Sequence, residues 1–165
     1  MNILLIAYFF KPDKKVGALR ASYWYENLSS LMDCNVSVVT ANAESKGEAV
    51  HVVPLSSMPP KLALNKDVGK QWSNDLKLFF EASNIKNPDV VIITGSPFTH
   101  FGIGEYLKNK FHSKIILDYR DPFAVNPGFK NTPFKIWVKK LAERRYNRIA
   151  DGLVTVNKYL SLIHI

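Results

Sequence analysis

The feature that most constrains the fold is a set of short segments that are apolar at almost every position. Residues 3–8 read Ile-Leu-Leu-Ile-Ala-Tyr, and residues 89–94 read Asp-Val-Val-Ile-Ile-Thr. A strand with one face in solvent alternates apolar and polar residues, whereas a strand covered on both faces is apolar throughout. These segments therefore predict strands inside a parallel sheet that has helices on both sides.

Further strands and helices alternate along the chain. We expect shorter strands at residues 36–40, 50–53, 114–119 and 152–156, and apolar residues at helical spacing predict helices at 19–32, 72–80, 97–111 and 133–149. Ser96-Pro97 and Thr132-Pro133 each fit a helix start, with a capping hydroxyl followed by proline at the first helical position. The order βαββαβαβαβ predicts an α/β fold, a Rossmann-like doubly wound parallel sheet.

Length and composition restrict the class of protein. A chain of 165 residues is long enough for one domain. Its composition, with 47% hydrophobic and 22% charged residues, excludes intrinsic disorder. The single cysteine, Cys34, cannot form an internal disulfide, and the four histidines have no metal-ligand spacing, so we expect no metal. No apolar run approaches the ~20 residues of a membrane-spanning helix, and the start lacks a basic signal-peptide region, which together predict a cytoplasmic protein.

The charge of the chain favours anionic partners. There are 22 Lys and Arg residues against 14 Asp and Glu, for a net charge of +8. Nucleic acid, phosphorylated substrates and acidic membranes all fit such a charge. Much of this positive charge lies in the helix expected at 133–149. That helix has one acidic residue, Glu143, and basic residues at 135, 139, 140, 144, 145 and 148. We expect its apolar face, with Phe134 and Trp137, to pack on the sheet; the alternative is that this helix lies on an anionic membrane.

Three segments of unusual composition follow predicted strands, where doubly wound sheets bind their ligands. The first, residues 11–20, places Gly17 beside a predicted helix start and Arg20 one turn later. Glycine lets backbone N–H groups approach a phosphate, a helix N-terminus favours negative charge, and arginine can add a bidentate contact. The alternative is a plain turn with a solvated arginine.

The second segment, Gly95-Ser96-Pro97-Phe98, is either a helix start or part of a binding site. The third contains Asp118, Arg120 and Asp121 at a strand end, followed by a stiff Pro-Phe pair. Carboxylates there can accept hydrogen bonds from substrate hydroxyls or take a proton, and the arginine can hold a phosphate. The alternative is a structural Asp–Arg pair that closes the loop. We expect the three loops to converge on one crevice.

Together, these segments resemble the N-terminal domain of family-4-type retaining glycosyltransferases of the GT-B fold. The resemblance runs from Met1 to about Asn157, and the Asp118–Phe123 motif with Gly95–Phe98 upstream is its most specific part. The family often has two adjacent glycines in the first loop, where this chain has Gly17 and Ala18. Many relatives have a histidine where Arg120 or Asp121 stands here.

The resemblance implies an enzyme with two Rossmann-like domains that face each other across a cleft. The N-terminal domain mostly binds the acceptor, and the C-terminal domain mostly binds the nucleotide-sugar donor. Residues 1–165 would form only the acceptor-side domain, so we expect this chain to lack a donor-binding domain and to be inactive alone. By position, Gly17 and Arg20 would stand near the donor phosphates, Ser96, Pro97, Phe98 and Asp118 would line the acceptor side, and Arg120 and Asp121 are the catalytic candidates.

The same resemblance implies that the nucleotide sugar is a substrate, that no cofactor or metal is required, and that the acceptor is a glycan or a lipid-phosphate-linked molecule. The basic helix fits such an acceptor at the inner face of a membrane, in surface polysaccharide or glycolipid assembly. Two alternatives stay open. One is a stand-alone binding module that pairs with a separate donor-domain chain. The other is a nucleic-acid-binding α/β domain, which the charge alone favours; since recognition motifs are missing, we expect no nucleic acid.

Overall fold

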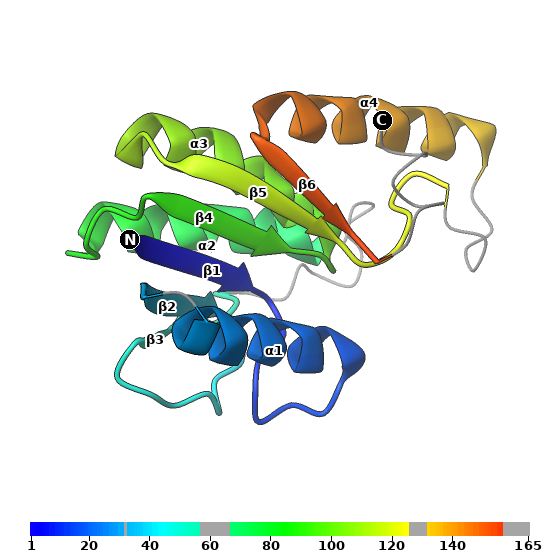
Figure 1. The fold of residues 1–165 in the computed structure, drawn as a ribbon. Helices are drawn as coiled ribbons and strands as arrows, with labels where there is room; N and C mark the ends of the chain where they lie inside the picture. The colour runs from blue at the N-terminus through cyan, green and yellow to red at the C-terminus, as the bar shows by residue number, and fades with distance from the viewer. Residues whose placement is uncertain (32, 57–66, 126–131, 157–165) are drawn as a thin grey trace.

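The computed structural model describes residues 1–31, 33–56, 67–125 and 132–156 (Figure 1). Its centre is a six-stranded sheet with the strand order β3-β2-β1-β4-β5-β6. All five neighbouring pairs are parallel. The strands are β1 (Asn2–Ala7), β2 (Asn35–Thr40), β3 (Val50–Val52), β4 (Val90–Thr94), β5 (Lys114–Tyr119) and β6 (Gly152–Thr155). The predicted doubly wound parallel sheet is confirmed.

Helices cover both faces of this sheet. They are α1 (Val16–Leu31), α2 (Val68–Ala82), the 3₁₀ helix η1 (Phe98–Gly102), α3 (Ile103–Phe111) and α4 (Pro133–Ile149). Helix α1 lies on one face, and α2, α3 and α4 lie on the other (Figure 1). Ile3 and Leu5 of β1 pack with Ala21 of α1, whereas Leu4 packs with Trp72 of α2. Successive residues of a strand point to opposite faces, so a strand covered on both sides must be apolar throughout.

Of the two predicted helix starts, one is confirmed. The Thr132 hydroxyl accepts a hydrogen bond from the Lys135 backbone N–H, and Pro133 is the first residue of α4. The prediction for Ser96 was wrong: the cap position of η1 is Pro97, without a side-chain hydrogen bond, and α3 begins only at Ile103. Both peptide bonds that flank Ser96 are cis.

The Phe98 ring packs against the turn after β4. A β-carbon at Gly95 would overlap the Phe98 ring, so the absence of a side chain at Gly95 lets the ring fold back over the end of β4. The ring then stacks on Tyr119 at the end of β5, with 5.7 Å between centroids and 18° between planes. A tertiary aromatic contact thus takes the place of the expected helix cap.

Helix α4 meets the core through a different face from the one expected. The prediction that its apolar stripe packs on the sheet was wrong for its first half, because Phe134 and Trp137 are 70% and 57% exposed. The core instead contacts Ala142, Tyr146 and the residue that follows the helix, Ala150. These three residues are four apart in sequence, so they form a stripe of their own, rotated away from the Phe134 side of the helix.

The strand order also fixes where loops gather. From β1 the chain moves to β2 on one side, and from β4 it moves to β5 on the other, so the direction of winding reverses between β1 and β4. In open α/β sheets, ligands bind outside the carboxyl ends of the strands at such a reversal.

No helix within the described ranges combines the length and apolar character needed to cross a bilayer.

Candidate functional site

The three segments singled out in the sequence follow β1, β4 and β5, which are neighbours in the sheet. Their carboxyl ends lie at one edge, on the right in Figure 1. The Gly95 backbone N–H donates to the Asp118 carbonyl at 3.0 Å, which ties the second segment to the third. The Arg20 side chain reaches Asp118 and ties the first segment to the third. The three segments therefore lie together at one edge of the sheet.

Asp118 is the most buried charged group at this edge. It is fully buried and accepts hydrogen bonds from Arg20 Nε at 2.8 Å, from Arg20 Nη2 at 2.5 Å and from Trp24 Nε1 at 3.1 Å. The hydrogen bonds to Asp118 raise the pKa of Arg20 further above its ordinary value. Asp118 has no exposed surface, so the expectation that it lines the acceptor side was wrong. Its role is to hold the Arg20 guanidinium in place through two hydrogen bonds.

Arg20 itself remains accessible to a ligand. Its side chain is 26% exposed, although two of its nitrogens donate to Asp118. A bidentate pair of this kind fixes the plane of the guanidinium as well as its position. Arg20 is therefore a cation held in one place at the carboxyl end of the sheet.

A second arginine lies against the start of α1. Helix α1 begins at Val16, three residues before the predicted start at Leu19, and its second residue, Gly17, is buried. A β-carbon at Gly17 would lie 3.0 Å from Arg120 Nη1 and 3.2 Å from Phe9 Cδ2, so the missing side chain allows the guanidinium to approach. The first turn of a helix presents free backbone N–H groups and a partial positive charge. Arg120 therefore packs directly against the first turn of α1.

Arg120 is held by its neighbour in sequence. Its Nε donates to Asp121 Oδ2 at 2.9 Å, and the two side chains are 24% and 44% exposed. Of the two aspartates in the third segment, Asp121 is thus accessible and Asp118 is covered. The two aspartates separate into one that can meet a substrate and one that positions an arginine.

An aromatic wall stands beside the charged groups. Ser96, Pro97 and Phe98 are half-buried, and the Phe98 ring lies 5.4 Å from the Phe123 ring in addition to its stack on Tyr119. Burial raises the pKa of Tyr119 well above its ordinary value, so its phenol stays protonated. The edge therefore combines two fixed arginines, the accessible carboxylate of Asp121 and an apolar wall.

Trp24 is a site residue that the sequence analysis treated only as part of an apolar helix face. It follows Arg20 by four residues, a spacing that places both side chains on the same side of α1. This spacing was the signal available in the sequence. Its indole N–H occupies the carboxylate oxygen that Arg20 Nε also uses, which completes the support of Arg20.

His100 lies in the core and not at the site. It is fully buried, with its ring 5.2 Å from Trp72 and 5.5 Å from Phe101. Burial lowers its pKa to about 4, so the ring is neutral at physiological pH. Within the described part of the chain, no group of three or more His, Cys, Asp or Glu side chains is arranged to hold a metal ion.

Comparisons with known proteins do not assign the site. No family model and no curated protein matches the chain. A similar solved structure is that of a protein of unknown function from Vibrio parahaemolyticus RIMD 2210633, with a TM-score of 0.44 and 14% identity over 95% of this chain and 93% of that chain. A likeness at this level carries no argument about function.

Proposed function

We propose that this chain is the acceptor-side, N-terminal domain of a glycosyltransferase that moves a sugar from a nucleotide-sugar donor to a glycan or lipid-linked acceptor. The motifs that resemble this family are Gly95–Phe98 and Asp118–Phe123, and they follow adjacent strands next to the winding reversal. Ligands of doubly wound folds bind at that position.

The observation that carries the proposal is the pair of fixed guanidinium groups beside the first turn of α1. Arg20 is held by Asp118, and Arg120 is held by Asp121 and lies against Gly17. A nucleotide sugar presents a diphosphate, which arginine recognises by bidentate hydrogen bonds and a helix N-terminus stabilises electrostatically. Because Asp118 and Asp121 hold the two guanidinium groups, binding costs little side-chain ordering.

Each residue then has a distinct role. Gly17 allows the Arg120 guanidinium to lie against the first turn of α1, and Arg20 and Arg120 neutralise the phosphate oxygens. Asp121 can orient an acceptor hydroxyl and accept its proton, since it is the accessible carboxylate. Pro97 and Phe98 provide an apolar surface for the acceptor. Asp118 acts only through Arg20, as a positioning residue.

Titration of the isotopically labelled chain with uridine, adenosine and guanosine diphosphates tests the proposal. We expect amide chemical shifts to change at Gly17, Arg20 and Arg120. The variant Arg120→Gln removes a charged hydrogen-bond donor and weakens binding by about tenfold. The matched control is Arg148→Gln, which makes the same charge change on an exposed residue of α4 and leaves the dissociation constant unchanged.

Two results would contradict this function. One is a set of shift changes that avoids the edge formed by β1, β4 and β5. The other is equal weakening in both variants, which would mean that net charge alone attracts the ligand. Single-stranded oligonucleotide that binds more tightly than the diphosphates, with a steep dependence on salt, would instead favour the nucleic-acid alternative.

A further inference from the structure

The first half of α4 carries an exposed apolar surface, here called the α4 patch: Phe134, Trp137, Val138 and Leu141. Their side chains are 70%, 57%, 44% and 44% exposed. The rings of Phe134 and Trp137 stack, with 6.0 Å between centroids and 29° between planes. Single exposed apolar residues are ordinary, but four large ones grouped on consecutive turns of one helix mark an interaction surface.

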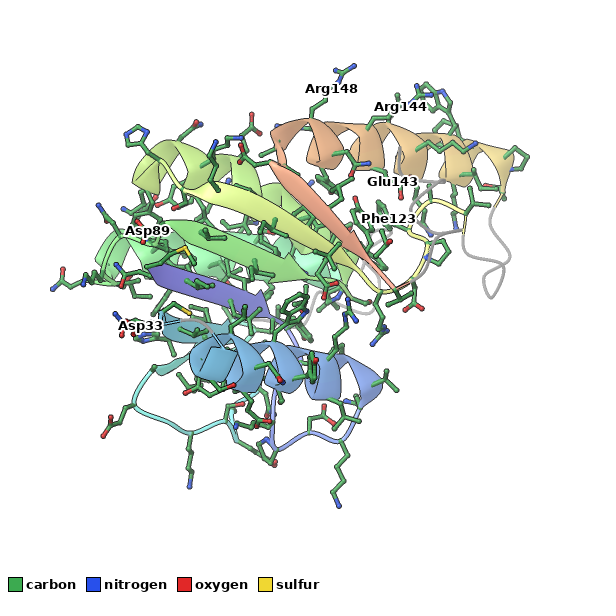
Figure 2. All side chains as sticks on the ribbon, viewed as in Figure 1. Asp33, Asp89, Phe123, Glu143, Arg144 and Arg148 are labelled. Carbon is green, nitrogen blue, oxygen red and sulfur yellow. The ribbon has the colours of Figure 1, made fainter. Side chains whose placement is uncertain are left out.

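Positive charge continues from the α4 patch toward the end of the helix. The spacing of Arg144, Arg145 and Arg148 continues the exposed side of the helix beyond Leu141. Figure 2 shows Arg144 and Arg148 pointing away from the sheet, while Glu143, the helix's one acidic residue, points toward it and is buried. Arg145 also pairs with Glu105 of α3 at 2.7 Å. The solvent side of α4 is therefore apolar at its start and cationic along the rest.

A groove between α2 and α4 adjoins the patch. It has a volume of about 520 Å³ and is lined by Lys70 and Lys77 of α2 and by Leu141 and Arg145 of α4. Its one carboxylate, Asp67, already accepts hydrogen bonds from the Lys70 backbone and from Thr99. Leu141 belongs to both the patch and the groove, so an apolar surface and a cationic groove form one continuous face.

We propose that this face docks on an anionic phospholipid membrane. Phe134 and Trp137 enter the headgroup region, where aromatic side chains have their highest affinity. Lys70, Lys77 and the arginines of α4 meet the lipid phosphates. Interfacial helices bind through this combination of buried apolar area and attraction to anionic lipid. A second copy of this chain would instead bring two cationic faces together in a protein of net charge +8.

Docking also has a consequence for the candidate site. Helix α4 begins at the end of the sheet where β5 ends (Figure 1). The α4 patch therefore lies toward the same end of the molecule as Arg20 and Arg120, and a docked chain holds that edge close to the bilayer. The docking proposal does not depend on the glycosyltransferase proposal, because it rests on α4 and the groove alone.

Binding of the whole chain to vesicles tests this inference. We expect the chain to sediment with phosphatidylcholine vesicles that contain phosphatidylglycerol and not with pure phosphatidylcholine, and to dissociate as salt is added. The Trp137→Ser variant loses apolar area at the interface and binds about tenfold more weakly. Its matched control is Tyr23→Ser, which removes an aromatic ring that is 62% exposed on α1, across the sheet, and leaves binding unchanged.

A second pair of variants tests the charge. Arg144→Glu combined with Arg148→Glu weakens binding by more than about tenfold, since each cation near the surface attracts anionic lipid. Lys46→Glu combined with Lys86→Glu makes the same charge change at exposed residues away from α4 and has a much smaller effect. Circular dichroism checks that all variants are folded.

Three results would overturn the docking proposal. The first is no binding to phosphatidylglycerol vesicles, and the second is equal binding by Trp137→Ser and Tyr23→Ser. The third is a concentration-dependent dimer in light scattering that Trp137→Ser abolishes, which would assign the α4 patch to a second copy. Diphosphate titration of Trp137→Ser separates the two proposals, because nucleotide binding at Arg120 should not change.

Discussion

The ion pair between Arg20 and Asp118 permits the sharpest test of the site, because its two ends have different environments. Asp118 is fully buried, whereas the Arg20 side chain is 26% exposed. The perturbation is a double-mutant cycle that consists of Arg20→Met, Asp118→Asn and the double variant. Methionine retains the apolar stem of arginine without its charge, and asparagine retains the shape of aspartate without its charge.

The structure predicts unequal effects of the two single changes. Arg20→Met removes two of the three side-chain hydrogen bonds to the buried Asp118 carboxylate and leaves only the one from Trp24. This change should lower the free energy of unfolding by about 3–5 kcal/mol. Asp118→Asn leaves Arg20 uncompensated, but that guanidinium can turn toward solvent, and the cost should be about 2 kcal/mol. The double variant removes both charges and should cost about 2 kcal/mol less than the sum of the two.

Urea unfolding followed by tryptophan fluorescence measures these free energies. A domain of this size has about 5–15 kcal/mol of stability, so the loss in Arg20→Met is large enough to be unmistakable. Arg148→Met is the matched control, since it removes an exposed arginine from α4 and should change stability by less than about 0.5 kcal/mol. A cost under about 1 kcal/mol for Arg20→Met, or single changes that add without coupling, would refute the structural role of this ion pair.

The other predictions concern stability. Burial lowers the pKa of His100 to about 4, so between pH 6.5 and 4 the unfolded chain binds a proton that the folded chain does not. The free energy of unfolding should therefore fall by about 3 kcal/mol as the pH drops from about 6.5 to 4. Urea midpoints across this range should fall less steeply in His100→Gln, and equal slopes would contradict the assignment. Gly95→Ala should cost about 1–3 kcal/mol because its β-carbon overlaps Phe98, whereas Gly152→Ala, with 3.7 Å to the nearest atom, should cost less in the same assay. Thr132→Ala removes the cap of α4 and should cost about 1 kcal/mol in thermal unfolding; no change would mean that the cap is not used.

Local sequence determined most of the architecture. Continuous apolar strands such as residues 3–6 and 91–93 require cover on both faces, and their alternation with helices leaves a doubly wound parallel sheet as the natural arrangement. The Thr132-Pro133 start of α4 was equally readable, because a cap is made by residues three positions apart. The sequence also indicated the edge of the sheet where charged loops meet, since each loop directly follows its strand.

The sequence does not predict which charged side chains pair with each other at that edge. Asp118 pairs with Arg20, which is 98 residues away, and not with Arg120, which is two residues away. Charge and spacing allow either pairing, and only the position of α1 against β5 decides between them. The Ser96 cap failed for a related reason, because the turn after β4 is packed through a long-range contact, the stack of Phe98 on Tyr119.

Helix α4 is a second case in which the sequence alone does not decide the structure, here which face of the helix is buried. Its sequence contains two stripes with apolar residues, one with Phe134 and Trp137 and one with Ala142 and Tyr146. Hydrophobicity alone favours the stripe with the larger side chains for the core, yet the structure buries the smaller one and exposes the α4 patch. Sequence periodicity determines that a helix has a given face. Which face is buried depends on how the helix is rotated when it packs, and that is decided only when the sheet and its neighbouring helices are assembled.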